Sequence, residues 1–380
     1  MRKGDSFREF IKSVLMRLFW IIPIKKKKIV FSCFSGKSYG DSPRAIAEEI
    51  IRQKLDYDMY WLMLPDYDVD LPKEIKRIPM SFWSQAYHLS TAHIWVDSHT
   101  KWDFVRKRKG QYYIETWHGG LGKKVEGDAA NALPSDYLQR TKHNAELADL
   151  FISNSTFNTE QYRRAFWYKG EIMECGCPKN DIYFSNFLGS VTRVKRVLNI
   201  PENTKIALYA PTFRVDEQLK YYSLNYDMVK NALKTKFGGE WCVLVRLHPV
   251  LMKKADNFIQ YSKEIINASQ YDSMQDLLVS ADDYITDYSS PMFEICMLKK
   301  PVFLFATDFE EYMKDRGWYF DYFNMPFLAA QNNEELVNNI INFSQKEYET
   351  KLIKFWEEIG LKENGTASKQ VVERIKTEIK

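Results

Sequence analysis

The stretch Gln111-Tyr-Tyr-Ile-Glu-Thr-Trp-His-Gly-Gly-Leu-Gly-Lys-Lys124 joins an apolar run to a histidine, three glycines and two lysines. Residues 111–116 have the length and composition of a short buried strand. The glycines that follow let the backbone turn tightly and approach a ligand closely. His118 therefore lies at the carboxyl end of a strand, the edge at which open α/β sheets bind ligands. This position favours a reactive or phosphate-contacting imidazole; the alternative is a structural histidine in a glycine-rich turn.

The composition excludes several classes of protein. A chain of 380 residues with 45% hydrophobic residues can form one or two cores, and its length favours two domains. Its net charge of only +4 argues against a dedicated nucleic-acid binder. The five scattered cysteines are typical of reduced, buried thiols in a cytosolic protein. Cys175 and Cys177 are the one close pair, too weak a signal to predict a metal site.

Residues 5–24 predict an amphipathic helix that ends at Pro23. One side of it carries Phe7, Phe10, Ile11, Val14, Leu15, Leu18 and Phe19. Because Arg17 interrupts the apolar part and no cleavage site follows, neither a transmembrane helix nor a signal peptide fits. The adjacent Lys25-Lys-Lys-Lys28 makes residues 1–27 typical of a segment that lies on an anionic membrane surface. The alternative is a helix packed on the domain beside a solvated charge run.

Strands and helices alternate in the first half of the chain, which predicts a parallel, doubly wound sheet. We expect strands at 28–34, 58–63, 93–97, 111–116, 149–153 and 171–175, and helices at 43–52, 82–91 and 155–167. Ser42 and Pro43 form a good N-cap and first-turn pair for the helix at 43–52. Ser35-Gly-Lys-Ser38 resembles the end of a Walker A loop, but Phe31 stands where that motif needs glycine, which excludes an ATPase site.

A change in composition between Asn186 and Asn203 predicts a domain boundary. We expect an N-terminal domain at 28–190 and a C-terminal domain at 191–380. The second half begins again with a strand at 204–211, followed by Thr212-Phe-Arg214. A further strand at 241–247 contains Arg246 and places His248 at its end.

The strongest phosphate-binding signal is Asp282-Asp-Tyr-Ile-Thr-Asp-Tyr-Ser-Ser-Pro-Met-Phe-Glu-Ile-Cys296. A strand that ends near Thr286 precedes Ser289 and Ser290, and Ser290 with Pro291 predicts an N-cap and first helical turn. Free N–H groups, hydroxyls and the positive helix end would suit a pyrophosphate, and Glu294 could accept from ribose hydroxyls. A well-capped helix without a ligand is the alternative.

Several blocks together resemble the CDP-glycerol glycerophosphotransferase family of teichoic-acid and capsule synthesis. They are Thr116-Trp-His-Gly-Gly120, Gly176-Cys-Pro-Lys-Asn-Asp181, Ala210-Pro-Thr-Phe-Arg214, Arg246-Leu-His-Pro249, Ile285-Thr-Asp-Tyr-Ser-Ser290, Ser35-Gly-Lys-Ser-Tyr-Gly-Asp-Ser-Pro43 and Lys314-Asp-Arg-Gly-Trp-Tyr-Phe320. The resemblance covers roughly residues 28–345. One departure is Gly120-Leu121, where family members often have Thr-Pro, and it leaves the identity of the acceptor open.

The resemblance implies an α/β, GT-B-like architecture with two Rossmann-like domains, held at the cytoplasmic face of the membrane as a peripheral protein. It implies transfer of glycerol phosphate or another alditol phosphate from a CDP-linked donor to an undecaprenyl-linked or polymeric acceptor, with release of CMP. Homo-oligomer formation stays open. Carried over by position, His118 would be the catalytic base, and His248 would act on the donor phosphates. The expected donor contacts are Thr212, Arg214, Arg246, Thr286, Ser289, Ser290 and Glu294.

No metal or other cofactor is expected, because arginine, histidine and backbone N–H groups can stabilise the charge of the phosphates. Two alternatives remain at this point. One is a GT-B glycosyltransferase that uses a nucleotide sugar, since a similar pocket would serve either donor. The other is an inert membrane-surface scaffold, against which the presence of both His118 and His248 argues.

Overall fold

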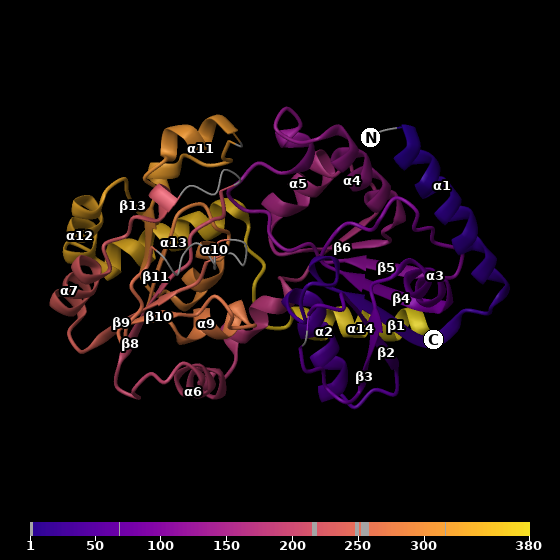
Figure 1. Cartoon of the computed structure of the whole chain (residues 1–380), viewed down its shortest axis with the longest axis horizontal. Helices are drawn as coiled ribbons and strands as arrows, with labels where there is room; N and C mark the ends of the chain where they lie inside the picture. The colour runs from indigo at the N-terminus through magenta and orange to yellow at the C-terminus, as the bar shows by residue number, and fades with distance from the viewer. Residues whose placement is uncertain (1–2, 68, 215–218, 248–250, 252–257, 316) are drawn as a thin grey trace. The chain divides into compact units, whose positions relative to one another are not determined.

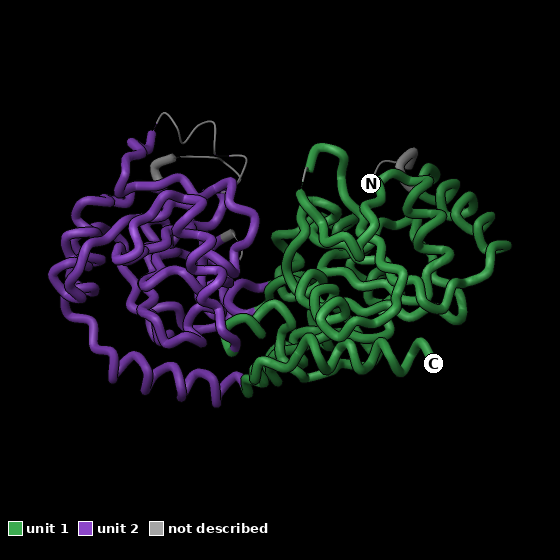
Figure 2. The backbone as a smooth tube through the Cα atoms, turned by 90° about the horizontal axis from the view of Figure 1, so that it is seen from below, with its two compact units in different colours: residues 1–120, 125–184, 360–380 green, residues 121–124, 185–359 purple. Residues whose placement is uncertain are grey.

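The computed structural model describes residues 3–67, 69–214, 219–247, 251, 258–315 and 317–380. The chain forms two compact units (Figures 1 and 2). Unit 1 comprises residues 1–120, 125–184 and 360–380, and unit 2 comprises residues 121–124 and 185–359.

Unit 1 is built on a seven-stranded sheet in the order β3-β2-β1-β4-β5-β6-β7, in which all paired strands are parallel. This is the strand order of a doubly wound nucleotide-binding sheet with one more strand at its end. The strands are β1 Lys25–Ser32, β2 Asp58–Met63, β3 Ile75–Pro79, β4 Ala92–Asp97, β5 Tyr112–Glu115, β6 Leu150–Ser153 and β7 Glu171–Glu174.

Helices cover both faces of this sheet, because successive residues of its central strands are buried on opposite sides. On one face Ile29 and Phe31 belong to a core with helices α2 and α14, and on the other Val30 belongs to a core with α1, α3, α4 and α5. The helices are α1 Lys3–Leu18, α2 Asp41–Arg52, α3 Phe82–Thr91, α4 Ser135–Leu147, α5 Thr156–Ala165 and α14 Ala367–Ile379.

Unit 2 contains a six-stranded parallel sheet in the order β10-β9-β8-β11-β12-β13. Its strands are β8 Lys205–Tyr209, β9 Trp241–Val245, β10 Ile265–Asn267, β11 Asp283–Thr286, β12 Val302–Phe305 and β13 Leu328–Ala330. Its helices are α6 Leu188–Val197, α7 Tyr226–Phe237, α9 Met274–Ser280, α10 Met292–Ile295, α11 Phe309–Asp315, α12 Asn333–Ile341 and α13 Gln345–Ile359. The predicted α/β class with two Rossmann-like parallel sheets is thus confirmed.

The compact units differ from the expected domains at the C-terminus. Helix α14 belongs to unit 1, although the sequence placed it in a domain at 191–380. Val371, Val372 and Ile375 are fully buried in the core that contains β1 and α2, which explains this position.

Two local expectations are corrected near the N-terminus. Helix α2 begins at Asp41 with Gly40 as its N-cap, not with Ser42. Ser42 is fully buried, and its hydroxyl lies 3.2 Å from the sulfur of Cys177. The lysine run also forms the start of β1, so Lys25, Lys26 and Lys27 are exposed while Lys28 is buried.

Helix α1 presents an apolar face to solvent. Phe7, Phe10, Ile11, Val14 and Leu18 are all exposed, and Ile21 beyond the helix is 88% exposed. The opposite side packs inward through Ser13 and Met16, which are buried. Within the described residues, no helix has both the length and the apolar character needed to cross a membrane.

Candidate active site

His118 follows strand β5 at the carboxyl edge of the unit 1 sheet, as predicted. Its Nδ1 lies 2.6 Å from the main-chain oxygen of Ser98, which follows β4. A carbonyl oxygen only accepts hydrogen bonds, so Nδ1 carries the proton and Nε2 keeps its lone pair. In this tautomer Nε2 can accept a proton from a substrate hydroxyl.

Aromatic rings surround the imidazole of His118. The ring of His99 stacks on it at 5.6 Å between centroids, with 7° between the planes. The ring centroids of Phe34 and Trp117 lie 5.1 and 4.3 Å from the centroid of His118. Burial among these rings is the main reason that the pKa of His118 falls to about 4, and the neighbouring His99 lowers it further. The imidazole is therefore neutral at physiological pH, the form that a general base requires.

A buried glutamate fixes the backbone that leads into His118. Trp117 adopts φ 52°, a left-handed conformation that costs a bulky residue about 1–3 kcal/mol. Its N–H donates to Glu115 Oε1 at 2.9 Å. Glu115 Oε2 accepts from the Tyr113 hydroxyl at 2.6 Å and from Asn144 Nδ2 at 2.8 Å. Burial and the negative charge of Asp97 raise the pKa of Glu115 to about 7.

A second buried network fixes the carbonyl group that holds His118. Asp97 Oδ2 lies 2.5 Å from Lys101 Nζ, and Asp97 Oδ1 accepts from the backbone N–H groups of Ser98 and His99 at 2.8 and 3.1 Å. Asn144 Oδ1 accepts from the N–H of Lys101 at 2.9 Å. Asn144 thus joins the network behind Trp117 to the network behind Ser98.

One lysine brings three of the motif blocks together. Lys179 Nζ donates to Asp41 Oδ2 and to the main-chain oxygen of His118, each at 3.2 Å. Both side chains of the Lys179–Asp41 pair are less than one tenth exposed. The blocks at 35–43, 116–120 and 176–181 therefore meet at the same edge of unit 1.

In unit 2 the expected donor residues lie at the carboxyl ends of neighbouring strands. Thr212 and Arg214 follow β8, Arg246 follows β9, and Ser289 and Ser290 follow β11. Since these three strands are adjacent and parallel, the residues share one edge of the sheet. His248 lies outside the described residues.

The guanidinium of Arg214 is hydrogen-bonded to other groups of the protein. Its guanidinium donates to Asp308 at 2.6 and 2.9 Å, to Asp287 at 2.9 Å and to the main-chain oxygen of Thr212 at 2.6 Å. Burial alone would lower the pKa of Arg214, but Asp308 and Asp287 outweigh it and raise the pKa. Because four of the five N–H donors are used, this geometry favours a positioning role for Arg214 over the expected contact with phosphate.

The other expected donor residues differ in how accessible they are. Ser289 and Ser290 are partly exposed. Thr286 is fully buried and donates its hydroxyl hydrogen to Ala210 O at 2.8 Å, which gives it a structural role. Arg246 donates to the main-chain oxygen of Tyr271, and Glu294, 7% exposed, accepts from Gln275 Nε2 at 3.2 Å.

The expected helix start at Ser290 is wrong. Helix α10 spans only four residues, its N-cap is Pro291, and no side chain caps it. Tight turns lead into this short helix, with the N–H groups of Met292 and Phe293 bonded to the main-chain oxygens of Ser289 and Ser290. A helix this short contributes little dipole to anion binding.

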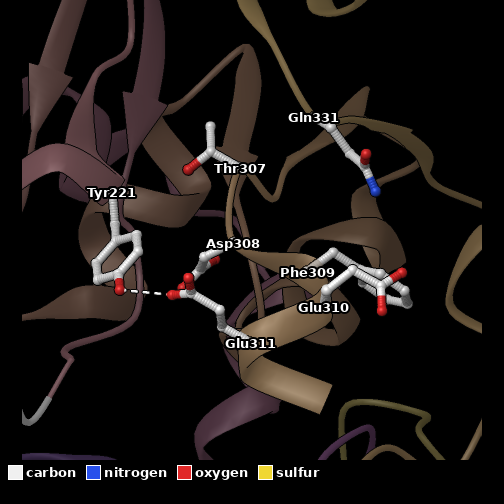
Figure 3. A pocket seen from close by; sticks show the side chains of 7 residues that line it. All are labelled: Tyr221, Thr307, Asp308, Phe309, Glu310, Glu311 and Gln331. Atoms are coloured by element: carbon white, nitrogen blue, oxygen red, sulfur yellow. Dashed lines mark hydrogen bonds between the residues drawn. The ribbon is translucent and has the colours of Figure 1, made fainter. Parts of the chain in front are cut away.

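A pocket of about 300 Å³ lies at the carboxyl ends of β12 and β13 (Figure 3). Its lining residues are Tyr221, Thr307, Asp308, Phe309, Glu310, Glu311 and Gln331. The Tyr221 hydroxyl donates to Glu311 Oε2 at 2.7 Å (Figure 3). Asp308 is the carboxylate that binds Arg214. Because the described lining carries the carboxylates of Asp308, Glu310 and Glu311, it suits hydroxyl groups better than phosphate.

The described part of the chain contains no cluster of three or more histidine, cysteine or acidic side chains that could hold a metal ion. The residues that sequence reasoning missed are buried polar groups: Glu115, Asn144, Asp97, Lys101, Asp41, Lys179, Asp287 and Asp308. Glu115 had a local signal, as a carboxylate that ends an apolar strand directly before His118.

Comparison with known proteins gives a family match that includes all the motif blocks quoted above. Residues 14–377 match the family model described as CDP-glycerol:poly(glycerophosphate) glycerophosphotransferase. A teichoic acid poly(glycerol phosphate) polymerase from Staphylococcus epidermidis is 32% identical over 376 residues, which cover 94% of this chain and 51% of the relative. A polymerase of the same description from Bacillus spizizenii is 28% identical, with 99% of this chain and 98% of the relative covered.

The chain spans about half the length of two of the polymerases it matches, those from Staphylococcus epidermidis and Bacillus subtilis. Among solved structures, a variant of the wall teichoic acid polymerase TagF superimposes with a TM-score of 0.84 and 28% identity, covering 100% of this chain and 98% of that one.

Proposed function

The chain belongs to the CDP-glycerol:poly(glycerophosphate) glycerophosphotransferase family, and on that premise we propose that it transfers glycerol phosphate from CDP-glycerol to a teichoic-acid acceptor. The observation that carries this proposal is His118, a neutral imidazole whose Nδ1–H is bound to Ser98 O. A base of this kind can activate an acceptor hydroxyl at physiological pH.

In the proposed reaction the acceptor hydroxyl attacks the phosphorus that bears the glycerol. The bond from this phosphorus to the bridging oxygen breaks, CMP leaves, and His118 Nε2 takes the hydroxyl proton. Unit 1 supplies this base and fixes it through Ser98 and the strained turn at Trp117. Positioning of the nucleophile and stabilisation of phosphate charge account for most of the rate in such transfers.

Unit 2 supplies the proposed donor contacts. Ser289, Ser290 and Arg246 are the groups at the carboxyl edge that we assign to the donor phosphates, with His248 as a further phosphate contact. Glu294 is assigned to the ribose hydroxyls, since its carboxylate can accept two of them. Arg214 holds the loop that contains Asp287 in place for these contacts.

We propose that no metal ion is needed for this reaction, because hydrogen-bond donors and cations at the edge of unit 2 can stabilise the charge that develops on phosphate oxygens. Chelation with EDTA tests this point. Activity that is lost on chelation and returns only with a divalent cation would contradict it.

We also propose that α1 holds the protein on the cytoplasmic face of an anionic membrane as a peripheral protein. The exposed face formed by Phe7, Phe10, Ile11, Val14 and Leu18 offers apolar area for burial in the interface. Lys25, Lys26 and Lys27 are exposed close to it in the sequence and would add electrostatic attraction. An acceptor linked to undecaprenyl would be delivered from the same surface.

The direct experiment measures release of the nucleotide. Purified protein is incubated with a soluble glycerol-phosphate acceptor and, in separate reactions, CDP-glycerol, CDP-ribitol and UDP-sugars. Release of CMP from CDP-glycerol supports the proposal. Release of CMP from CDP-ribitol alone would show that the alditol transferred is ribitol. UDP release would instead support a glycosyltransferase, the alternative that the family and the named relatives do not favour.

A further inference from the structure

The loop after β1 contains three successive residues in the left-handed region. Phe34 has φ 44°, Ser35 has φ 55° and Gly36 has φ 82°. Glycine adopts this conformation freely, but phenylalanine and serine do so rarely. Strain of this kind persists only where the surroundings impose it, and it is concentrated at functional sites.

The surroundings of this loop do impose its conformation. The N–H of Leu64 donates to Gly36 O at 2.8 Å, and Trp61 Nε1 donates to Ser38 O at 3.1 Å. A Cβ on Gly36 would come within 3.2 Å of the Leu64 nitrogen. The loop is therefore held firmly at the ends of β1 and β2.

The strained loop faces the proposed base. Phe34 packs edge-on against His118, and Ser35 Oγ lies 3.3 Å from His99 Nδ1. His99 in turn stacks directly on His118. A group bound by Ser35 and His99 would thus be adjacent to a hydroxyl that His118 deprotonates.

The same place carries unpaired positive charge. Lys37 is exposed and forms no ion pair with any residue that the structure describes. Burial is the main reason that the pKa of His99 lies below its usual value; Asp97 opposes this effect, while the positive charges of Arg140 and Lys37 add to it. Asp97 is paired with Lys101, which offsets its negative charge, so the ammonium group of Lys37 would attract an anion bound at this site.

We propose that Ser35, Lys37 and His99 form a subsite for a phosphodiester of the acceptor. The inference rests on the proposed function, in which the donor phosphates are assigned to unit 2. In a glycerol-phosphate chain only three carbons separate the terminal hydroxyl from the nearest phosphate. A hydroxyl placed at His118 therefore places that phosphate close to the Ser35–His99 pair, where a hydroxyl, an imidazole and an ammonium group can bind it.

The test compares Ser35→Ala and Lys37→Gln with matched controls in the same unit. Ser38→Ala removes a hydroxyl from the same loop, and Lys73→Gln removes an exposed charge before β3, at the amino edge of the sheet. We expect each test variant to raise the acceptor KM about fivefold to tenfold. The donor KM should stay within about twofold of the wild type, and both controls should resemble the wild type.

Direct binding keeps the subsite testable apart from the reaction. The probe is a short oligo(glycerol phosphate), titrated into each folded protein without donor by calorimetry. Binding that weakens in both test variants and not in the controls supports the subsite even if no CMP is released, an outcome that would refute only the proposed function. Equal binding in all proteins, or a rise in the CDP-glycerol KM in place of the acceptor KM, would overturn the inference.

Discussion

His118 Nδ1 lies 2.6 Å from the main-chain oxygen of Ser98, and this one contact decides which nitrogen of the imidazole can act. The proton on Nδ1 is held by an acceptor that cannot change its role, so Nε2 is left as the base. Two buried networks, through Glu115 and through Asp97, keep the imidazole and its acceptor in place.

The pH dependence of the rate should reflect the burial of His118. Its pKa is lowered to about 4, and protonation removes the lone pair that accepts the hydroxyl proton. We expect the rate of the chemical step to rise with pH through about 4 and to be level near neutrality. Single-turnover rates between pH 3.5 and 8 measure the midpoint, and one near 6.5 would show that the imidazole is hydrated in the reacting state.

Glu115→Gln should disturb His118 without touching it. If the new amide keeps its oxygen on the Trp117 N–H, its nitrogen faces Asn144 Nδ2, and two donors meet. An unsatisfied buried group costs about 1–3 kcal/mol, so we expect kcat to fall roughly tenfold to hundredfold with little change in the CDP-glycerol KM. Kinetics on folded protein measure this effect.

The matched variant restores the pairing. When Asn144→Asp is added to Glu115→Gln, the carboxylate at position 144 can accept from the new amide. The same carboxylate can still accept from the N–H of Lys101. We expect this double variant to recover most of the lost kcat and the tautomer of His118, which ¹⁵N chemical shifts report. If the double variant is as slow as the single one, or if the tautomer never changes, Glu115 does not position the base.

Arg214→Ala should affect stability, whereas Ser290→Ala should affect donor use. Removal of the guanidinium leaves the buried carboxylates of Asp287 and Asp308 unpaired, a change that costs about 3–5 kcal/mol. Ser290 is partly exposed, and its loss should raise the donor KM and lower the rate while the melting temperature stays the same. Urea unfolding and CMP-release kinetics on both variants separate the two roles. A stable Arg214→Ala protein with poor donor use would show that Arg214 contacts the donor phosphates directly.

The exposed face of α1 can be tested without removal of the helix. Deletion of residues 1–24 would uncover the surface under Met16. It would also remove the main-chain oxygens of Trp20 and Ile22, to which Arg108 donates. Phe7→Ser with Phe10→Ser avoids this damage. Because burial of one phenylalanine contributes about 1.5–3 kcal/mol, we expect sedimentation with anionic vesicles to fall at least tenfold. Unchanged sedimentation at an unchanged melting temperature would contradict membrane attachment through this face.

The sequence predicted helices and strands correctly where buried apolar residues recur at the regular spacing of a helix or a strand. The strand at 58–63 and the helix at 82–91 have the predicted bounds. Strand β3 was missed because Ile75-Lys-Arg-Ile-Pro79 alternates poorly at the edge of the sheet. Helix α4 was missed because its buried face contains Thr141 and Asn144, so its apolar period is weak.

The site was predictable to the extent that its residues follow strands. His118, Ser289 and Ser290 could be placed from strand ends alone. The partners that fix the base could not, because Asn144 lies 29 residues from Glu115 and no local pattern links them. The same holds for the pairing of Lys179 with Asp41, 138 residues apart.

The most direct measurement of the central claim is CMP release from CDP-glycerol by the wild type and by His118→Ala, with a soluble glycerol-phosphate acceptor and melting temperatures as the folding control. We expect turnover to be lower by about two to four orders of magnitude in the variant, at an unchanged donor KM. The acid limb of the pH profile should disappear with the imidazole. A folded His118→Ala protein with near-normal turnover and the wild-type pH profile would show that His118 is not the base.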